Sequence, residues 1–229
     1  MAKGNTMKFI EYPDRELLTM RVADELAGEI ENALFTHESA SFAVPGGTTP
    51  GPIFDMLSGT DLGWDKVNVM LTDERWVPED HDLSNTRLVR DRLLTGPAAA
   101  ATFLPFYRAG KTAAEACPEV AQTLVPHMPL SVLVLGMGDD MHTASLFPGA
   151  PGLEAALDGH APLLCPISPP DQDIDRVTLP AHALKGALST HVVIFGALKR
   201  NAVEKAQHLA PKDAPIAAVL GNATVHWAA

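Results

Sequence analysis

The sequence predicts an α/β protein in which helices flank a doubly wound, mostly parallel sheet. Short β-branched and aliphatic runs, typical of strands buried on both faces, alternate along the chain with longer segments of helical periodicity. Of the 229 residues, 46% are hydrophobic, which is enough for a large core. No repeat, low-complexity linker or break in composition divides the chain. We therefore expect a single α/β domain over residues 1–229, with the Pro- and Gly-rich tract at 148–170 as a surface excursion.

The first two predicted elements are a short strand at residues 8–12 and a long helix at about 14–35. The helix carries one apolar stripe, which recurs every four residues: Leu18, Val22, Leu26, Ile30 and Leu34. This spacing places the stripe on one face, so the helix is predicted to pack on the core.

The stretch from residue 41 to residue 57 predicts a strand, a loop and a helix. Pro50 suits the first helical position and Thr49 can cap the first turn. Gly46, Gly47 and Thr48 form the loop between them, where backbone amides can approach a ligand closely and the helix N-terminus adds partial positive charge. A phosphate cradle and a plain tight turn both fit this pattern, which matches neither the dinucleotide nor the Walker motif.

The rest of the chain continues the alternation of strands and helices. Strands are expected at 67–71, 103–106, 131–135, 163–167, 176–179, 191–195 and 224–227. Helices are expected at 85–94 with Ser84-Asn85 as its cap, at 112–125 with an interruption near Pro118, and at 198–209, besides a loop or marginal turn at 98–101 and a short apolar element at 215–220.

Polar groups follow four of the predicted strands. They are Gly46 to Thr49, then Asp73 to Arg75, then Asp140 and His142, and lastly Lys199. Taken singly, each group has a plainer interpretation as a solvated corner, a capping histidine or a surface lysine. Because parallel strands end at the same edge of a sheet, the four groups together predict one cleft with a binding or catalytic function.

Charge and cysteine content limit the kinds of partner. A net charge of −11 and a pI of about 5.2 argue against binding nucleic acid or an anionic membrane through a broad basic face. An anionic substrate must therefore be bound by a few local Arg and Lys side chains. Cys117 and Cys165, the only cysteines, do not make a disulfide scaffold and fit a reducing cytosol. No apolar run approaches the length of a membrane span, and residues 1–8 lack the apolar segment of an export signal, so we expect a cytoplasmic protein.

These motifs resemble those of 6-phosphogluconolactonases, within the wider group that includes glucosamine-6-phosphate deaminases. The similar stretches are PGGTTP at 45–50, TDERWVP at 72–78 with Ser84-Asn85 downstream, LGMG at 135–138 followed by HTASLFP at 142–148, RVTL at 176–179, and Gly196 with Lys199. They keep the family order and span most of the chain. The resemblance implies a Rossmann-like fold similar to that of glucosamine-6-phosphate deaminase.

The resemblance also implies an activity, the hydrolysis of 6-phospho-D-glucono-1,5-lactone to 6-phospho-D-gluconate in the oxidative pentose phosphate pathway. His142 would be the general base that activates water, with Asp140 orienting its imidazole or binding a sugar hydroxyl. The candidate substrate- and phosphate-binding residues are Gly46, Gly47, Thr48, Asp73, Arg75, Arg176 and Lys199. No cofactor or metal is expected, since the other histidines lack the close spacing of a zinc site. The expected partner is the small sugar-phosphate lactone, bound by a monomer or small homo-oligomer.

Two other functions are compatible with parts of this pattern. A glucosamine-6-phosphate deaminase/isomerase would have a carboxylate before the final proline of the histidine stretch to relay a proton, whereas here that residue is Phe147. A non-catalytic sugar-phosphate sensor would keep the phosphate-binding groups without needing His142.

Residue 141 departs from the family pattern, which has glycine between the aspartate and the histidine. Here it is Met141. If the glycine serves a positive φ, methionine is strained at this position. If the glycine only leaves room, the methionine can line the pocket.

Overall fold

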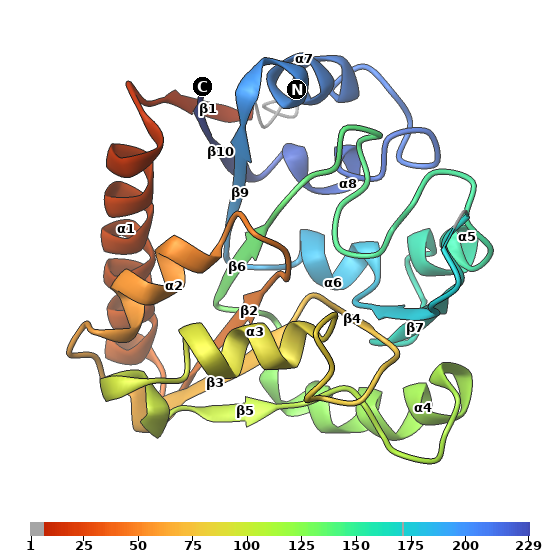
Figure 1. Cartoon of the computed structure of the whole chain (residues 1–229), viewed down its shortest axis with the longest axis horizontal. Helices are drawn as coiled ribbons and strands as arrows, with labels where there is room; N and C mark the ends of the chain where they lie inside the picture. Colours follow the sequence, from red (N-terminus) through yellow and green to blue (C-terminus); the bar gives the residue numbers. More distant parts are fainter. Residues whose placement is uncertain (1–6, 171) are drawn as a thin grey trace.

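The computed structural model describes residues 7–170 and 172–229 (Figure 1). Residues 1–6, part of the stretch in which the sequence shows no export signal, lie outside the described residues. The central sheet has seven strands in the order β1-β10-β9-β6-β2-β3-β5, and every neighbouring pair is parallel. Its strands are β1 Lys8–Glu11, β2 Ala40–Val44, β3 Val67–Leu71, β5 Thr102–Leu104, β6 Val132–Leu135, β9 Ser189–Phe195 and β10 Ala223–Ala228. The predicted parallel, doubly wound sheet is confirmed.

The helices form layers on both sides of this sheet, with α1 and α2 in contact on one side and α6 and α8 in contact on the other (Figure 1). They are α1 Arg15–Thr36, α2 Gly51–Ser58, α3 Asn85–Arg92, α4 Ala113–Leu124, α5 Leu153–Leu157, α6 Ala181–Lys185, α7 Gly196–Ala206 and α8 Ala217–Leu220, with 3₁₀ turns η1 Trp64–Lys66, η2 Gly96–Ala100 and η3 Val125–His127. The first four members of the predicted α1 stripe are fully buried, and Leu34 is half-buried. Predicted and observed boundaries differ by no more than three residues.

Two local predictions are wrong. Helix α2 begins at Gly51 with Pro50 as its N-cap, and no side chain caps it, so Thr49 has no capping role. Proline fills the N-cap position here with a helical φ of −80°. Helix α4 is not interrupted at Pro118 but runs over Ala113–Leu124, because a buried apolar stripe and a complete capping box offset the one lost backbone hydrogen bond.

A second, three-stranded antiparallel sheet was not predicted. It consists of β4 Asp73–Arg75, β8 Arg176–Thr178 and β7 Cys165–Ile167, in the order β4-β8-β7. Strand β7 belongs to the 148–170 tract, which is not merely a surface excursion because it buries Leu153, Ala156 and Leu164. Strands were expected at 163–167 and 176–179, where β7 and β8 lie, but β4 was not expected, because its pairing with β8 joins residues far apart in sequence, such as Asp73 and Thr178. This small sheet lies where β3 ends and supplies part of the candidate site.

A chain of hydrogen bonds runs beneath α1 on the buried face of the sheet. Tyr12 Oη lies 2.9 Å from Nδ1 of His226, Nε2 of His226 lies 3.0 Å from Nδ1 of His191, and Nε2 of His191 lies 2.7 Å from Oε2 of Glu29. Burial, the largest single influence on Glu29, raises the pKa of this carboxyl group, but the interactions with His191, Ser189 and His226 together outweigh burial and leave the pKa lowered. Since the ionised carboxylate only accepts, each group along the chain donates toward Glu29, and both imidazoles are satisfied while neutral.

This chain predicts a loss of stability in acid. Burial, followed by the neighbouring His191, lowers the pKa of His226 from 6.5 to about 3. At a pH between these two pKa values, His226 carries a proton in the unfolded chain but not in the folded chain. The free energy of unfolding therefore falls as the pH falls, by up to about 1.4 kcal/mol per pH unit.

Urea unfolding of the wild type and of His226→Gln at about pH 7 and about pH 5 measures this effect. We expect the wild type to lose about 1–2 kcal/mol more than the variant over this interval. Equal losses in the two proteins would show that His226 does not supply the acid sensitivity.

Candidate active site

A pocket of about 250 Å³ lies at the carboxyl ends of the parallel strands. Its walls are the loop after β2, the loop after β6, the β4–β8 strand pair and the start of α7. It is lined by these predicted site residues: Gly46, Gly47, Thr48, Asp73, Arg75, His142, Arg176 and Lys199. Asp140, also predicted, does not line the pocket but contacts His142. The structure thus brings together residues that are up to 153 positions apart, from Gly46 to Lys199.

His142 is held in one orientation by Asp140. Its Nδ1 lies 2.5 Å from Oδ1 of Asp140, which also accepts a hydrogen bond of 3.2 Å from the backbone N–H of His142. An ionised carboxylate only accepts, so Nδ1 carries the ring hydrogen and Nε2 keeps its lone pair. A Cβ on Gly138 would lie 2.2 Å from this ring, and the Phe147 ring packs at 4.4 Å between centroids. The imidazole is therefore fixed in the form that accepts a proton at Nε2.

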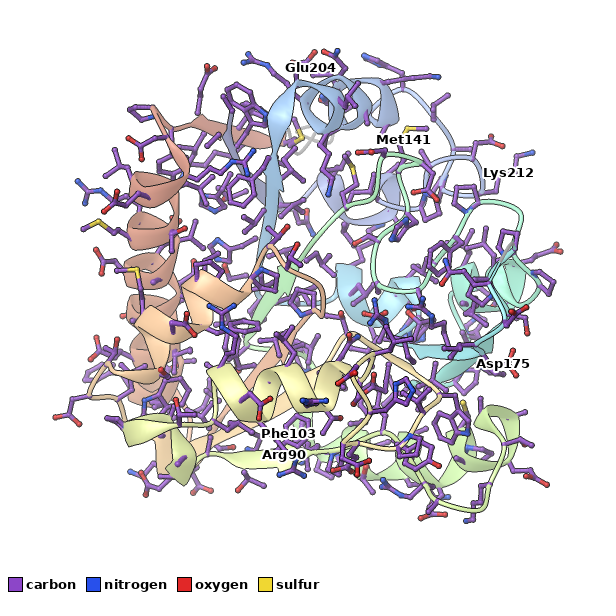
Figure 2. All side chains as sticks on the ribbon, in the orientation of Figure 1. Arg90, Phe103, Met141, Asp175, Glu204 and Lys212 are labelled. Atoms are coloured by element: carbon purple, nitrogen blue, oxygen red, sulfur yellow. The ribbon has the colours of Figure 1, made fainter. Side chains whose placement is uncertain are left out.

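Met141 precedes this histidine on the loop after β6 (Figure 2) and has a φ of +66°. The family glycine thus stands at a left-handed position, and a methionine there stores about 1–3 kcal/mol of strain. Two backbone hydrogen bonds hold it, one to Gly138 (3.0 Å) and one from Ile216 (3.1 Å). Met141 does not line the pocket. Ala144, at +48°, is a second residue with positive φ in the same loop.

Arg75 and Arg176 lie directly opposite each other on β4 and β8. Within residues 7–170 and 172–229 neither forms an ion pair, and the Nε atom of each is buried without a hydrogen-bond partner. Burial lowers the pKa of Arg176, and the charge of Arg75 lowers it further. Like charges opposite each other on neighbouring strands are destabilising, whereas an anion between them would pair with both. The arrangement is suited to binding a phosphate or carboxylate.

Glu74 anchors the strand that carries Arg75. Its fully buried carboxylate accepts hydrogen bonds from the backbone N–H groups of Asn85 (2.8 Å) and Thr86 (2.9 Å) and from the hydroxyl of Ser84 (3.1 Å). Burial raises the pKa of Glu74, and the hydrogen bonds from Asn85 and Thr86 oppose that rise. Because these amides are the otherwise unpaired donors of the first turn of α3, Glu74 fixes β4 to this helix.

The glycine loop packs against the same helix. A Cβ on Gly46 would lie 1.8 Å from Oδ1 of Asn85, so only glycine permits this approach. Asn85 Nδ2 in turn donates to the carbonyl of Asp73 (2.8 Å). Gly47 has a φ of +85°, which glycine adopts without strain. The loop is thereby joined through Asn85 to the strand that carries Arg75.

Lys199 completes the positive side of the pocket. It lies in the first turn of α7 and makes no ion pair with any residue that the structure describes. Among the described residues that line the pocket, Lys199, Arg75 and Arg176 are the three cations, and Asp73 is the one carboxylate. A chain with a net charge of −11 thus has a locally positive pocket.

One group among the described residues has the spacing of possible metal ligands: Glu25, His191 and His226, with ligand atoms within 4.8 Å of one another. The facing nitrogens of the two histidines are 3.0 Å apart, with rings tilted by only 21° and centroids 5.2 Å apart. The rings therefore meet nearly end to end, and the lone pair of one nitrogen points at the hydrogen of the other rather than at a shared ion. This geometry fits the hydrogen-bond chain beneath α1 and not a metal centre.

Several pocket and support residues were not identified from the sequence as functional. They are Ser145 and Thr178, which bridge walls of the pocket, Gly138 beneath the histidine ring, Glu74, and Asn85 as a link to the glycine loop. All five lie in or beside the motif stretches, and this position was the one indication of their role that the sequence offered. Their contacts join segments far apart in sequence and cannot be derived from spacing.

Comparison with known proteins identifies the family. Residues 13–227 match the family described as glucosamine-6-phosphate isomerases/6-phosphogluconolactonase. A protein of Pseudomonas aeruginosa named 6-phosphogluconolactonase is 41% identical over 213 residues, covering 90% of this chain and 88% of that protein. One of Rhizobium meliloti with the same name is 39% identical over 230 residues, covering 97% and 98%.

A solved structure gives the same result. The crystal structure of a 6-phosphogluconolactonase from Shewanella baltica superimposes with a TM-score of 0.94 at 33% identity, covering 97% of this chain and 98% of that one. None of the helices in the described part of the chain has the length and apolar character that crossing a membrane requires. The resemblance drawn from the motifs is confirmed, and the chain belongs to the glucosamine-6-phosphate isomerase/6-phosphogluconolactonase family.

Proposed function

We propose that this chain is an enzyme that hydrolyses 6-phospho-D-glucono-1,5-lactone to 6-phospho-D-gluconate in the oxidative pentose phosphate pathway. The observation that carries the proposal is the shared pocket, in which an oriented histidine lies in the same hollow as two arginines that form no ion pair with any described residue. The names of the similar proteins support the same activity.

The phosphate of the substrate binds at the positive side of the pocket. Arg75 and Arg176 supply charged donors, including Nε–H groups that have no partner within residues 7–170 and 172–229, and Lys199 adds a point charge. Gly46, Gly47 and Thr48 supply backbone amides and a hydroxyl from the loop before α2. Binding the phosphate directs the lactone ring toward His142.

His142 then acts as the general base. Nε2 takes a proton from water as the water oxygen bonds to the lactone carbonyl carbon, and Asp140 stabilises the imidazolium that forms. When the tetrahedral intermediate collapses, the bond from that carbon to the ring oxygen breaks. The ring oxygen receives the proton back from His142, which leaves the free hydroxyl of 6-phosphogluconate and a carboxyl group that ionises in water.

The chain acts as a single domain over residues 1–229, as a monomer or small homo-oligomer, with no cofactor and no nucleic-acid partner. Its acidic composition and free buried cysteines support a place in the cytoplasm. Burial raises the pKa of Cys117 to about 12 and of Cys165 to about 11, which keeps both thiols protonated and unreactive.

The deaminase alternative is disfavoured by Phe147. This residue stands where deaminases have a proton-relaying carboxylate, and its buried ring packs on His142. A sensor that does not turn over its ligand has no need for the Asp140–His142 hydrogen bond. Hydrolysis therefore accounts for more of the pocket than either alternative.

The division of roles between His142 and Lys199 is testable by steady-state kinetics, measured above the spontaneous hydrolysis of the lactone. His142→Ala should lower kcat by about 10²–10⁴-fold, because the base is lost. Lys199→Ala should chiefly raise KM, by about tenfold or more, because a charged contact to the phosphate is lost.

Lys205→Ala is the matched control for the lysine, since Lys205 lies exposed on the same helix α7 and outside the pocket. It should leave both constants unchanged. A reversed pattern, with KM raised by the histidine variant and kcat lowered by the lysine variant, would reject the assignment. Glucosamine 6-phosphate assayed in parallel should give no turnover.

Gly138→Ala tests whether the histidine must be held by Asp140. The added Cβ would lie 2.2 Å from the His142 ring and 2.5 Å from Oδ1 of Asp140, so it must push the two side chains apart. We expect kcat to fall by about a hundredfold, because the base loses its orientation. Gly159→Ala, whose Cβ meets nothing within 4 Å, is the control and should be fully active. Full activity in Gly138→Ala would contradict the proposed role of this contact.

A further inference from the structure

Ser145 joins two walls of the pocket. Its side chain is fully buried, and its hydroxyl donates a hydrogen bond of 2.6 Å to Oδ2 of Asp73. Its backbone N–H donates to the hydroxyl of Thr178 at 3.3 Å. Ser145 follows His142 by three residues, Asp73 precedes Arg75 by two, and Thr178 follows Arg176 by two. Both contacts therefore join the histidine loop to the strand pair that carries the arginines.

Asp73 accepts hydrogen bonds from several other residues of the chain. Only 6% of the residue is exposed, and its second carboxylate oxygen accepts a hydrogen bond of 3.0 Å from the hydroxyl of Thr72. Its carbonyl accepts from Asn85, which packs under the glycine loop. A carboxylate with these contacts is better placed to connect the walls than to bind an anionic substrate, which it would repel.

We propose that Ser145 and Asp73 are positioning residues, whose hydrogen bond sets the distance between the base on the β6 loop and the phosphate-binding arginines on β4 and β8. The proposal rests on the proposed lactonase function. It assigns to Asp73 a structural link between pocket walls in place of direct substrate binding.

The histidine loop needs such a link. Met141 and Ala144 hold its backbone at positive φ on either side of His142, a conformation that is strained for residues other than glycine. The hydrogen bond from Ser145 to the Asp73 carboxylate is charge-assisted, stronger than one between neutral groups, and it opposes the release of that strain. Without it the loop can relax away from the strand pair. A base displaced by about 1 Å loses about a hundredfold in rate, although the phosphate site itself is unchanged.

Ser145→Ala tests the proposal. We expect kcat to fall by about 10–100-fold, while KM and the inhibition constant of the product, 6-phosphogluconate, change by less than about threefold. Thr178→Val, which removes the second tether with little change in volume, should lower kcat in the same selective way but by less. If Ser145→Ala does not fold, the kinetic constants of Thr178→Val test the proposal in its place.

Ser131→Ala is the matched control. Ser131 is also buried, and its hydroxyl accepts a hydrogen bond of 3.1 Å from the N–H of Ser41, at the end of the sheet away from the pocket. It should lower the thermal unfolding temperature comparably and leave kcat unchanged. A kcat within threefold of the wild type in Ser145→Ala, or an equal loss in Ser131→Ala, would overturn the proposal. A parallel rise of the product inhibition constant would also overturn it. No wild-type rate above the spontaneous background would instead reject the lactonase function itself.

Discussion

The structure of the pocket depends on one unfavourable pairing, that of Arg75 with Arg176 across β4 and β8. Two guanidinium groups held opposite each other, largely out of water and without an ion pair among the described residues, repel each other in the unliganded protein. The fold maintains the pairing because both strands are fixed elsewhere. Glu74 fixes β4 to the N-terminus of α3, and the hydrogen bonds of β8 to β4 and β7 fix the other arginine. A bound dianion would offset this repulsion, and so a phosphate is the expected ligand.

Under the proposed function, the pocket separates two electrostatic tasks. Phosphate binding requires several positive charges, whereas a neutral imidazole that accepts a proton requires a negative neighbour. Asp140 provides that neighbour directly at Nδ1 of His142, and the cations lie on the other walls. Phe147 contacts both sides, since its ring packs on His142 and lies 5.8 Å from the Arg176 guanidinium.

Much of this arrangement could be predicted from the sequence, because strands buried on both faces and an apolar helical stripe are local patterns. The convergence of Gly46, Arg75, His142 and Lys199 followed from the rule that parallel strands end at one edge. The small antiparallel sheet did not follow, since three-residue strands gain their stability from distant partners. The hydrogen bond from Ser145 to Asp73 could not be predicted for the same reason, because it joins residues 72 positions apart in sequence. At residue 141, the sequence alone did not decide whether the family glycine serves a positive φ or only leaves room for the pocket. The positive φ of Met141 supports the first alternative.

The most direct test of the account is a crystal structure with 6-phosphogluconate bound. We predict the phosphate between Arg75, Arg176 and Lys199, with the product carboxylate next to Nε2 of His142, at the position from which water attacks. A phosphate bound beside His142, or a product molecule outside this pocket, would contradict the account.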